Sequence, residues 1–435
     1  MTIDFSNYTN IIDNTNLWTY VGKVSRVIGM GIESTGPKVN IGDICRVATK
    51  VAGGNIKAEV VGFKDGRIML MPLGSLEGIG PGCKVTASGE RLTVRVDDSL
   101  LGRIVDWQAL PIEGEPILCR DEVPIENTAP NPMNRNRIAR PLELGVKAID
   151  GMLTVGQGQR IGIFAGSGVG KSTLMGMLAR NALSDINIIA LIGERGREIR
   201  EFIENDLQEA GLKRSIIVVA TSDQPALMRM KAAKTATALA EYFREKGENV
   251  LLMMDSLTRF SMAQREIGLA IGEPPVSRGY PPSVFAELPK LLERAGNSDK
   301  GSITGMYTVL VDGDDFNEPI TDTARGILDG HILLSRKLAH KAHYPAIDIL
   351  GSISRVMSQI ATAEHKAMAN EIKKQLAVYK ESEDLINVGA YVKGSNPEID
   401  EAIKKNGPIN QFLCQSTEEK VDFEETLSIM REITT

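Results

Sequence analysis

A glycine-rich stretch between residues 165 and 173 holds the side chains most suited to phosphate chemistry. Glycines let successive backbone N–H groups turn toward one centre, Lys171 can reach terminal phosphates, and Ser172 offers a hydroxyl to Mg²⁺. Ala165 stands where the pattern usually has its first glycine, and a small residue still permits the turn. A surface loop that only happens to contain Gly-Lys-Ser is disfavoured, because an apolar run precedes it and a helical pattern follows. The predicted phosphate loop consists of Ala165, Gly166, Ser167, Gly168, Val169, Gly170, Lys171, Ser172 and Thr173.

A carboxylate that could assist this loop stands at residue 255. The apolar run at 250–254 is typical of a buried strand, and Asp255 follows it directly. In an open α/β sheet, ligands lie beyond the carboxyl ends of the strands. Asp255 is therefore expected to help Ser172 hold Mg²⁺, usually through water. It could also cap the helix that begins at Ser256, and the two roles are compatible.

A second carboxylate, Glu194, follows another apolar strand pattern. The run at 188–192 leads directly into a charged turn. Hydrolysis of a terminal phosphate needs a group that orients and polarises a water molecule, and a carboxylate at a strand end could do so. Taken alone, a glutamate after a strand is more often a solvated loop residue. The residues around Glu194 leave both interpretations open.

The rest of the chain divides into segments that would position these groups. Short β-branched runs separated by turn signals over 17–96 predict a small β-barrel. Prolines and few periodic runs over 97–150 indicate a linker and the entry to the core. Alternating strand and helix patterns over 151–357 predict an α/β domain on a largely parallel sheet, and 358–435 is helical in pattern. Residues 1–16 are polar and form either a loose tail or a short partner-binding helix.

Individual elements can be placed within these segments. Strands of the sheet are expected at 188–192, 215–220, 249–254 and 304–311. Helices of the C-terminal domain are expected at 364–379 and 418–433.

Composition excludes several classes of protein. The 435 residues are 42% hydrophobic and 24% charged, and no apolar run is long enough to cross a membrane. The N-terminus lacks a basic residue followed by an apolar core, so a secretory signal is not expected and the protein should stay in the cytosol. A net charge of −6 opposes binding to nucleic acid unless basic residues cluster on one face.

The cysteines and histidines do not form a metal-binding pattern. The cysteines lie far apart with no Cys-x-x-Cys pair, which suits buried thiols in a reducing compartment. His340 and His343 are close in sequence but have no nearby ligand pattern, so they are expected to be structural or solvent-facing. No metal beyond Mg²⁺ is implied. The cysteines are Cys45, Cys83, Cys119 and Cys414.

Several short motifs occur along the chain. They are Gly-Glu-Arg-Gly-Arg-Glu at 193–198, Ala-Thr-Ser-Asp-Gln-Pro at 220–225, Asp-Ser-Leu-Thr-Arg-Phe at 255–260, Gly-Glu-Pro-Pro at 272–275, Tyr-Pro-Ala-Ile-Asp at 344–348 and Ser-Ile-Ser-Arg at 352–355. Together they resemble the rotary-type ATPase family, and within it the type III protein-export ATPases. The resemblance runs from about residue 17 to the end. It implies a P-loop NTPase core of RecA-like type, between an N-terminal β-barrel and a small C-terminal helical domain.

The resemblance also implies roles for the residues already singled out. Glu194 matches the catalytic carboxylate of the family. Lys171 and Ser172 match its phosphate and Mg²⁺ contacts, and Asp255 matches the Walker B acid. The implied ligands are ATP and Mg²⁺.

Four further residues enter through the resemblance alone. Arg195 and Arg259 match arginines that line the nucleotide site. Tyr344 matches the aromatic residue that packs against adenine, although its pattern alone would also suit a core tyrosine. Arg355 matches the arginine finger that a neighbouring subunit supplies, and without the resemblance it would be one more surface arginine.

A central-pore loop is implied at 272–280, which corresponds to the family segment that faces a central stalk. Two adjacent prolines would make it stiff, as a contact loop should be. The alternative is a plain surface loop. The residues assigned to this role are Pro274, Pro275, Arg278 and Tyr280.

The function implied is that of a cytosolic Mg²⁺-dependent ATPase whose homohexamer works at the base of a bacterial protein-export apparatus, at the inner membrane periphery. Its implied partners are export-gate and stator-like regulatory proteins, export chaperones, cargo and a central stalk protein. Segments 168–173, 253–255 and 311–315 look more like the flagellar branch, whereas 278–283 is closer to the virulence (injectisome) branch. The flagellar branch is favoured.

Two other functions remain as alternatives. A catalytic subunit of a rotary ATP synthase usually shows another glycine pattern in its phosphate loop. A hexameric RNA translocase shares the core fold, but acidic net charge and a barrel without an evident aromatic and basic stacking surface count against it.

Overall fold

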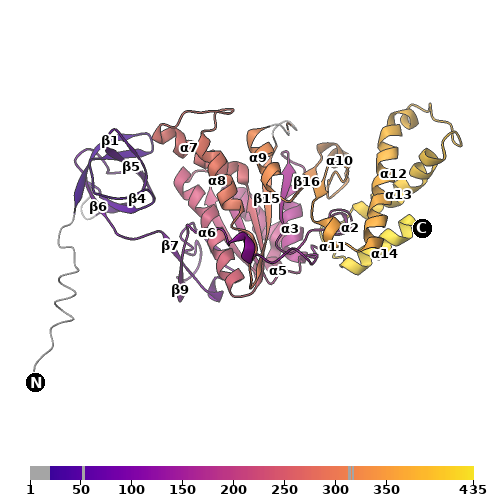
Figure 1. Cartoon of the computed structure of the whole chain (residues 1–435), viewed down its shortest axis with the longest axis horizontal. Coiled ribbons are helices and arrows are strands. Elements are labelled where there is room, and N and C mark those ends of the chain that lie inside the picture. The colour runs from indigo at the N-terminus through magenta and orange to yellow at the C-terminus, as the bar shows by residue number, and fades with distance from the viewer. Residues whose placement is uncertain (1–19, 51–53, 312–314, 316–317) are drawn as a thin grey trace, which may run out of the picture. The chain divides into compact units, whose positions relative to one another are not determined.

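A computed structural model describes residues 20–50, 54–311, 315 and 318–435 (Figure 1). The predicted tail at 1–16 lies outside these residues. The chain forms two compact units, of which the first extends to Leu92 and also takes in Glu266–Pro274. The second unit holds Thr93–Arg265 and Pro275–Thr435. Each unit has its own apolar core.

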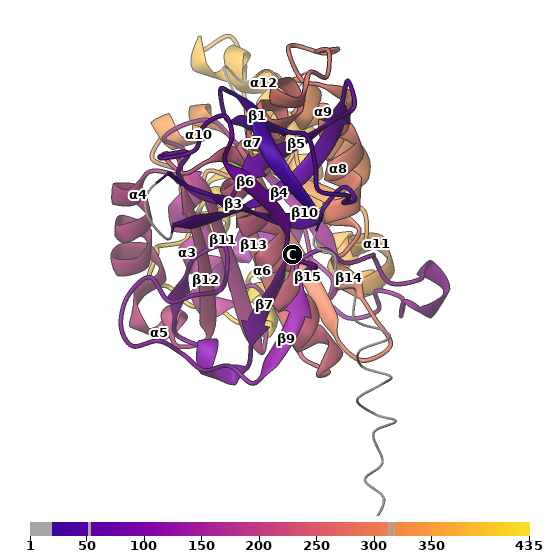
Figure 2. The same cartoon turned by 90° about the vertical axis from the view of Figure 1, so that its left-hand side faces the viewer.

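The first unit is a closed antiparallel barrel with strand order β1-β2-β5-β4-β3-β6 (Figure 2). Its interior is filled by apolar side chains that alternate with exposed ones, as in Val24, Val47 and Val85. The barrel predicted from the turn spacing is therefore confirmed. Its strands are β1 (Val21–Ile28), β2 (Gly31–Ser34), β3 (Ile44–Ala48), β4 (Asn55–Lys64), β5 (Arg67–Pro72) and β6 (Lys84–Ala87).

The barrel strands end before the predicted limit at residue 96. A polar stretch with Gly89 in a left-handed conformation (φ 71°) follows β6. Residues Thr93–Val96 then form β7, which pairs with β9 (Asp121–Pro124) in a separate two-stranded sheet. This segment therefore belongs to the second unit.

The second unit is built on a largely parallel sheet of order β17-β16-β10-β15-β13-β11-β12-β8. β17 pairs antiparallel with β16, and β14 pairs antiparallel with β15. Continuous apolar runs such as Ile188–Ile192 are buried on both faces, as parallel sheets require. The strands are β8 (Ile104–Val105), β10 (Arg160–Ala165), β11 (Ile186–Glu194), β12 (Ser215–Thr221), β13 (Asn249–Asp255), β14 (Gly296–Asn297), β15 (Ser302–Leu310), β16 (Gly330–Leu334) and β17 (Ile353–Ser354).

The strands expected from sequence lie within or close to β11, β12, β13 and β15. The stretch 97–150, predicted as a linker and the entry to the core, contributes β8 to the sheet edge beside β12. This strand has only two residues, too few to produce a periodic pattern. The stretch also contains η1 (Asp98–Leu100), η2 (Pro132–Asn134) and α2 (Lys147–Met152).

Helices pack on the sheet, and separate helices form the C-terminal part. Alanine-rich α6 packs on β11, β12 and β13, where small side chains allow a close approach. The helices between the strands are α3 (Lys171–Asn181), α4 (Gly196–Glu201), a π-helical segment η3 (Phe202–Leu207), α5 (Gln208–Leu212), α6 (Ala226–Glu245), α7 (Leu257–Ile271), α8 (Pro282–Leu292), α9 (Pro319–Ile327) and α10 (Arg336–His340), and α11 (Met357–Ile360) follows the last strand.

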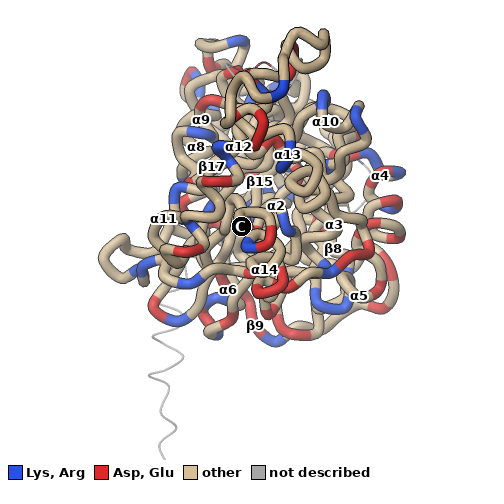
Figure 3. Tube along the Cα trace, turned by 90° about the vertical axis from the view of Figure 1, so that its right-hand side faces the viewer, with Lys and Arg blue, Asp and Glu red and all other residues tan. Residues whose placement is uncertain are grey.

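Three helices gather beside α2 in the C-terminal part: α12 (Ala363–Asn387), α13 (Pro397–Leu413) and α14 (Phe423–Thr434) (Figure 1). A Cβ at Gly151 would lie 2.8 Å from Met430 Sδ, so glycine lets α2 approach α14 closely. Basic and acidic positions are interspersed over this part of the surface (Figure 3), and pairs such as Arg431 with Glu364 lie 2.8 Å apart. The predicted helical domain is confirmed.

Candidate functional site

The phosphate loop joins the carboxyl end of β10 to the first turn of α3. Gly168 and Gly170 have φ angles of 75° and 85°, a left-handed conformation that favours glycine. Gly170 caps α3 without any side-chain hydrogen bond, so the first N–H groups of the helix are left for an anion. Ala165 is the last residue of β10 and pairs with Leu310 and Leu334 in regular strand geometry. A glycine is therefore not required at position 165.

Two acidic side chains converge on the lysine of this loop. Lys171 Nζ lies 2.5 Å from Asp255 Oδ1 and 4.0 Å from Glu194 Oε1. The two carboxylates come from the ends of β13 and β11, which are neighbours in the sheet. In the sheet, β15 separates β13 from β10, the strand that leads into the phosphate loop (Figure 2). The parallel register thus brings together three groups that lie far apart in sequence.

Asp255 is held within the sheet edge rather than used as a helix cap. Its Oδ1 accepts a hydrogen bond of 2.6 Å from the hydroxyl of Thr308 on β15. The start of α7 is capped by Ser256, whose Oγ accepts from Arg259 N at 3.2 Å. The described contacts therefore favour the ligand-holding role of Asp255 over the capping role.

Glu194 is turned toward the same place by an irregularity in β11. The register with β12 shifts between Ile192 and Glu194, and Gly193 at this bulge has a φ of 72°. Burial and the negative charge of Asp255 raise the pKa of Glu194 to about 7, against the opposing effect of Lys171. A carboxyl group with this pKa can take up and release a proton near neutral pH.

These groups line a cavity of about 850 Å³, large enough for a nucleotide. Tyr344 lies on its wall, about 3.5 Å from where a Cβ on Gly170 would stand. Its side chain is 44% exposed, which does not suit a core tyrosine. Gln415–Thr417 of the C-terminal part also line the cavity.

The two arginines expected at the site differ in their surroundings. Arg195 is 70% exposed and pairs with Glu198 at 2.5 Å, so it lies at the rim. Arg259 lies on the wall of the cavity, and its Nε is a buried donor without a hydrogen-bond partner among the described residues. A buried donor of this kind costs free energy unless a ligand satisfies it. Arg259 is thus suited to an anionic ligand.

Arg355 does not line the cavity of its own chain. It is exposed, directly after β17, and its guanidinium donates to the carbonyl oxygen of Arg325 at 3.3 Å. The structure therefore places Arg355 apart from the other predicted catalytic residues.

The predicted pore loop contains a tight turn. Tyr280 N donates to Ser277 O at 2.8 Å, and Arg278 and Gly279 between them both have positive φ angles. Arg278 is exposed and pairs with Asp315 at 2.9 Å. Tyr280 is only 5% exposed and packs edge-on against Phe285, so it anchors the turn instead of facing solvent. Pro274 and Pro275 are exposed.

The donors at the loop fit a hard divalent cation. The exposed hydroxyl of Ser172 and the carboxylate of Asp255 are oxygen ligands of the kind that Mg²⁺ prefers, with phosphate and water completing its shell. Among the described residues, no group of three or more His, Cys, Asp or Glu could hold a metal by itself. Cys45, Cys83 and Cys119 are buried as expected, whereas Cys414 is only partly buried; His343 is buried and His340 is exposed.

Thr308 and the segment Gln415–Thr417 are among the contributors to the site that sequence reasoning missed. Thr308 is a hydroxyl residue within an otherwise apolar strand pattern, and this interruption is the signal that could have identified it. Gln415–Thr417 lie more than two hundred residues from the phosphate loop and carry no recognisable motif.

Comparison with protein families gives matches along most of the chain. The nucleotide-binding domain of the ATP synthase alpha/beta family matches residues 145–354. The beta-barrel domain of the same family matches residues 24–89. The T3SS EscN ATPase C-terminal domain matches residues 361–432. None of the described helices is long and apolar enough to cross a membrane.

Individual proteins match over nearly the full length. The chain is 57% identical over 426 residues to the Flagellum-specific ATP synthase of Bacillus subtilis (strain 168), with 97% of each chain covered. The assembled ATPase EscN from the enteropathogenic E. coli type III secretion system matches with a TM-score of 0.90 and 48% identity, over 95% of this chain and 100% of that one. EscN in complex with its central stalk EscO matches with a TM-score of 0.87 and 47% identity over the same shares.

Proposed function

The chain belongs to the ATP synthase alpha/beta family, and on that premise we propose that it hydrolyses Mg²⁺-ATP as a homohexameric ring that energises flagellar protein export. The chain is an ATPase of the type III secretion class. The observation that carries the proposed chemistry is the convergence of Asp255 and Glu194 on Lys171 in one nucleotide-sized cavity.

Each residue of the cavity has a distinct task in the proposed reaction. Lys171, Arg259 and the first N–H groups of α3 bind the phosphates. Ser172 and Asp255 would hold Mg²⁺, which neutralises charge on the phosphates when bound. Glu194 orients the attacking water and accepts its proton, for which a pKa near neutrality is suited. Tyr344 stacks on the adenine ring.

The ring assembly is proposed from the position of Arg355, because Arg259 within the cavity is already assigned to phosphate binding and Arg195 lies at the rim. An arginine that stabilises charge on the terminal phosphate is expected in this chemistry, and Arg355 does not line the cavity of its own chain. We assign Arg355 to the site of the neighbouring subunit. One chain then supplies both halves of each site, which a closed ring of identical subunits satisfies. The number six comes from the family resemblance.

A mixing experiment tests action across the interface. Lys171→Ala should abolish ATP binding and turnover in its own site, and Arg355→Ala should abolish turnover while leaving binding intact. When the two inactive proteins are mixed, some interfaces join an intact phosphate loop to an intact finger, so ATPase activity should reappear. Mixed rings, verified by co-purification of two tags, that remain as inactive as either variant would contradict the proposal.

The flagellar role is proposed over the injectisome role because the flagellum-specific relative from Bacillus subtilis reaches 57% identity, against 51% for the Type 3 secretion system ATPase of Xanthomonas euvesicatoria. By the same resemblance, we expect partners of stalk, stator, chaperone and export-gate type and a peripheral position at the inner membrane. The test is to express this chain in Bacillus subtilis that lacks its Flagellum-specific ATP synthase. Restored motility is expected, with the Lys171→Ala variant as control. Motility that stays absent while the protein is expressed and active as an ATPase would count against the flagellar assignment.

A further inference from the structure

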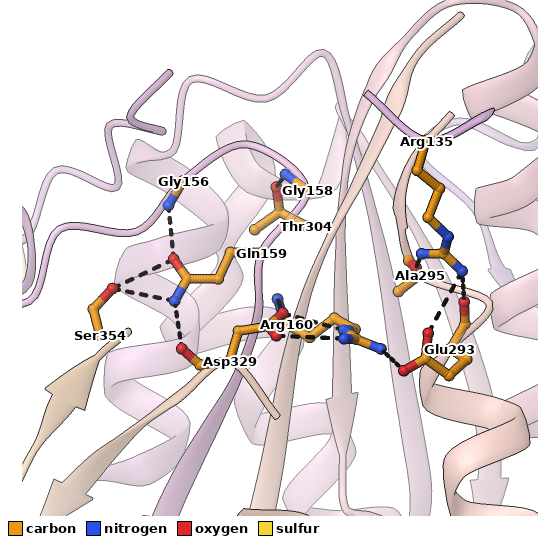
Figure 4. A network of polar contacts seen from close by, with 10 residues as sticks. All are labelled: Arg135, Gly156, Gly158, Gln159, Arg160, Glu293, Ala295, Thr304, Asp329 and Ser354. Carbon is orange, nitrogen blue, oxygen red and sulfur yellow. Dashed lines mark hydrogen bonds and ion pairs between the residues drawn. The ribbon is translucent and has the colours of Figure 1, made fainter. Parts of the chain in front are cut away.

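The main chain that leads to Arg355 is fixed by hydrogen bonds at the amino end of β10, where Ser354 contacts Gln159 (Figure 4). Arg355 N donates to the carbonyl oxygen of Asp329 at 3.0 Å. The hydroxyl of the preceding residue, Ser354, accepts from Gln159 Nε2 at 3.1 Å and donates to Thr154 O at 2.8 Å. These bonds leave little freedom to the backbone that carries Arg355.

Gln159 is the centre of this arrangement. Its side chain is fully buried, and both ends of the amide are used. Nε2 donates to Asp329 O at 3.1 Å as well as to Ser354, and Oε1 accepts from Gly156 N at 2.8 Å. Figure 4 shows the amide between these three segments. A single side chain therefore joins the start of β10 to β17 and to the residue before β16.

Asp329 is held from the other side by ion pairs. Its carboxylate accepts from Arg160 N at 3.1 Å and from Arg160 Nε at 3.2 Å. The Arg160 guanidinium also pairs with Glu293, which Arg135 contacts in turn. The next residue, Gly330, approaches β17 so closely that a Cβ there would lie 2.5 Å from Ile353 O. β16 and β17 are thus locked together just before Arg355.

The Arg355 side chain itself is exposed, and within the described part of the chain its guanidinium makes a single hydrogen bond, to Arg325 O. Where its guanidinium can reach is therefore decided by the main chain. We propose that Gln159 and Asp329 are positioning residues that aim Arg355 at the nucleotide of the neighbouring subunit. This inference rests on the proposed role of Arg355 as a finger that acts across the interface.

Gln159 could instead act through β10 on the phosphate loop of its own chain. The strand starts one residue after Gln159 and finishes at Ala165, the first residue of the phosphate loop. A change at Gln159 could thus act on the chain's own nucleotide site instead of on its finger. The two possibilities predict opposite results when subunits are mixed.

The first measurement uses rings of one variant. Gln159→Ala should lower ATP turnover roughly ten- to a hundredfold, since a misplacement of about 1 Å can cost on the order of 10²-fold in rate. Nucleotide affinity should be unchanged. The matched control is Thr304→Val, because Thr304 Oγ1 accepts from Gly158 N at 2.8 Å at the same edge but does not contact the Arg355 segment. This control should retain its turnover.

The second measurement mixes subunits. Gln159→Ala chains keep a good phosphate loop, so mixing them with Lys171→Ala chains, which keep a good finger, should restore activity. Mixing them with Arg355→Ala chains should not. The reverse pattern, rescue by Arg355→Ala and none by Lys171→Ala, would show that Gln159 acts on its own site and would overturn the proposal.

The remaining outcomes are also decisive. Mixtures of Lys171→Ala with Arg355→Ala serve as the reference, and their failure would remove the proposed finger and this inference with it. If that reference pair is rescued but Gln159→Ala is rescued by neither partner, only the positioning proposal falls. If Gln159→Ala does not fold by circular dichroism, Ser354→Ala replaces it, because that change removes the hydroxyl that bonds to Gln159 and to Thr154 O. The same mixing pattern is expected of it.

Discussion

The two ends of strand β10 are organised in different ways. At the carboxyl end, charged groups such as Lys171, Asp255 and Glu194 line an open cavity, and the pKa of Glu194 is raised to about 7. At the amino end, the fully buried amide of Gln159 makes hydrogen bonds with both its oxygen and its nitrogen. The first end is arranged to meet a ligand, whereas the second fixes neighbouring segments. Polar residues whose hydrogen-bonding groups are all paired within the chain therefore act to position the backbone. Polar residues that line an open cavity are available to bind a ligand.

The largest effect should come from Arg355, which the amino end positions. Arg355→Ala should lower turnover by roughly 10³–10⁵, the range for arginine fingers in phosphoryl transfer, with little change in ATP affinity. Steady-state turnover and fluorescent nucleotide binding would be measured in parallel. Arg355→Lys is the matched control and should recover only part of the loss, because lysine lacks the planar fork. If monomers and rings had equal specific activity, Arg355 would not act across the subunit interface. The proposed difference between the two ends of β10 would then be lost.

At the carboxyl end, Glu194→Gln should lower turnover by about 10²–10⁴ while ATP affinity is kept. The amide has nearly the same shape but cannot accept a proton from water. Glu204→Gln is a suitable control, since Glu204 is exposed, pairs with Arg200 at 2.7 Å and does not line the cavity. Lost ATP binding in a folded Glu194→Gln protein would instead make Glu194 a binding residue.

Tyr344→Ala should mainly raise the ATP concentration needed for half-maximal rate. Base stacking on an aromatic ring contributes about 1–3 kcal/mol, which corresponds to roughly 5- to 150-fold, and it acts on ground and transition states alike. Tyr344→Phe keeps the ring and should behave like the parent protein. An unchanged half-saturation concentration in the alanine variant would place Tyr344 outside the binding site.

The raised pKa of Glu194 predicts a pH dependence that belongs to the carboxyl end alone. Only the deprotonated carboxylate can accept a proton, so turnover should fall about tenfold per unit below a pH near 7. Turnover would be recorded between pH 5.5 and 8 at saturating ATP. The residual activity of Glu194→Gln should lack this slope, and a slope of equal size in that variant would assign the titration to another group.

The smallest change in turnover is expected for a substitution of Thr308 on β15, with Thr304 on the same strand as the comparison. Thr308→Val removes the 2.6 Å bond to Asp255 and should lower turnover several-fold, since a hydrogen bond contributes about 1 kcal/mol. Thr304→Val, near the other end of the same strand, should change thermal stability but not turnover. If both variants lost turnover equally, the two ends of the sheet would not be separable in function.

The carboxyl end could be predicted from sequence because local pattern determines it. An apolar strand pattern followed by glycines and Lys171, or by Asp255, identifies both the functional groups and their position at the carboxyl end of the strand. Gln159 offers no such signal, since its partners Asp329 and Ser354 lie 170 and 195 positions away and meet it only through the register of β10, β16 and β17. The role of Arg355 came from family resemblance and stays a prediction.

Other parts of the fold were beyond sequence patterns for physical reasons. β8 is too short for periodicity, and it pairs with β12 only because the sheet edge is available. Tyr280 was assigned to a contact surface, yet its ring is buried against Phe285. Aromatic residues in loops satisfy either role, and only packing decides between them.

The contacts of Gln415 limit how far the chain can be truncated from its C-terminus. Its side chain bonds to Lys147 N and Gly145 O at 2.8 Å each, and its own N–H donates to Tyr344 O at 2.9 Å. An excised nucleotide domain that stopped at residue 413 would remove the partner of Lys147 N and Gly145 O, which belong to buried residues, and a buried group left unpaired costs about 1–3 kcal/mol. It would also lose the wall of the cavity that Gln415–Thr417 provide. The segment that follows α13 is therefore not detachable, and a minimal catalytic fragment must include Gln415–Thr417.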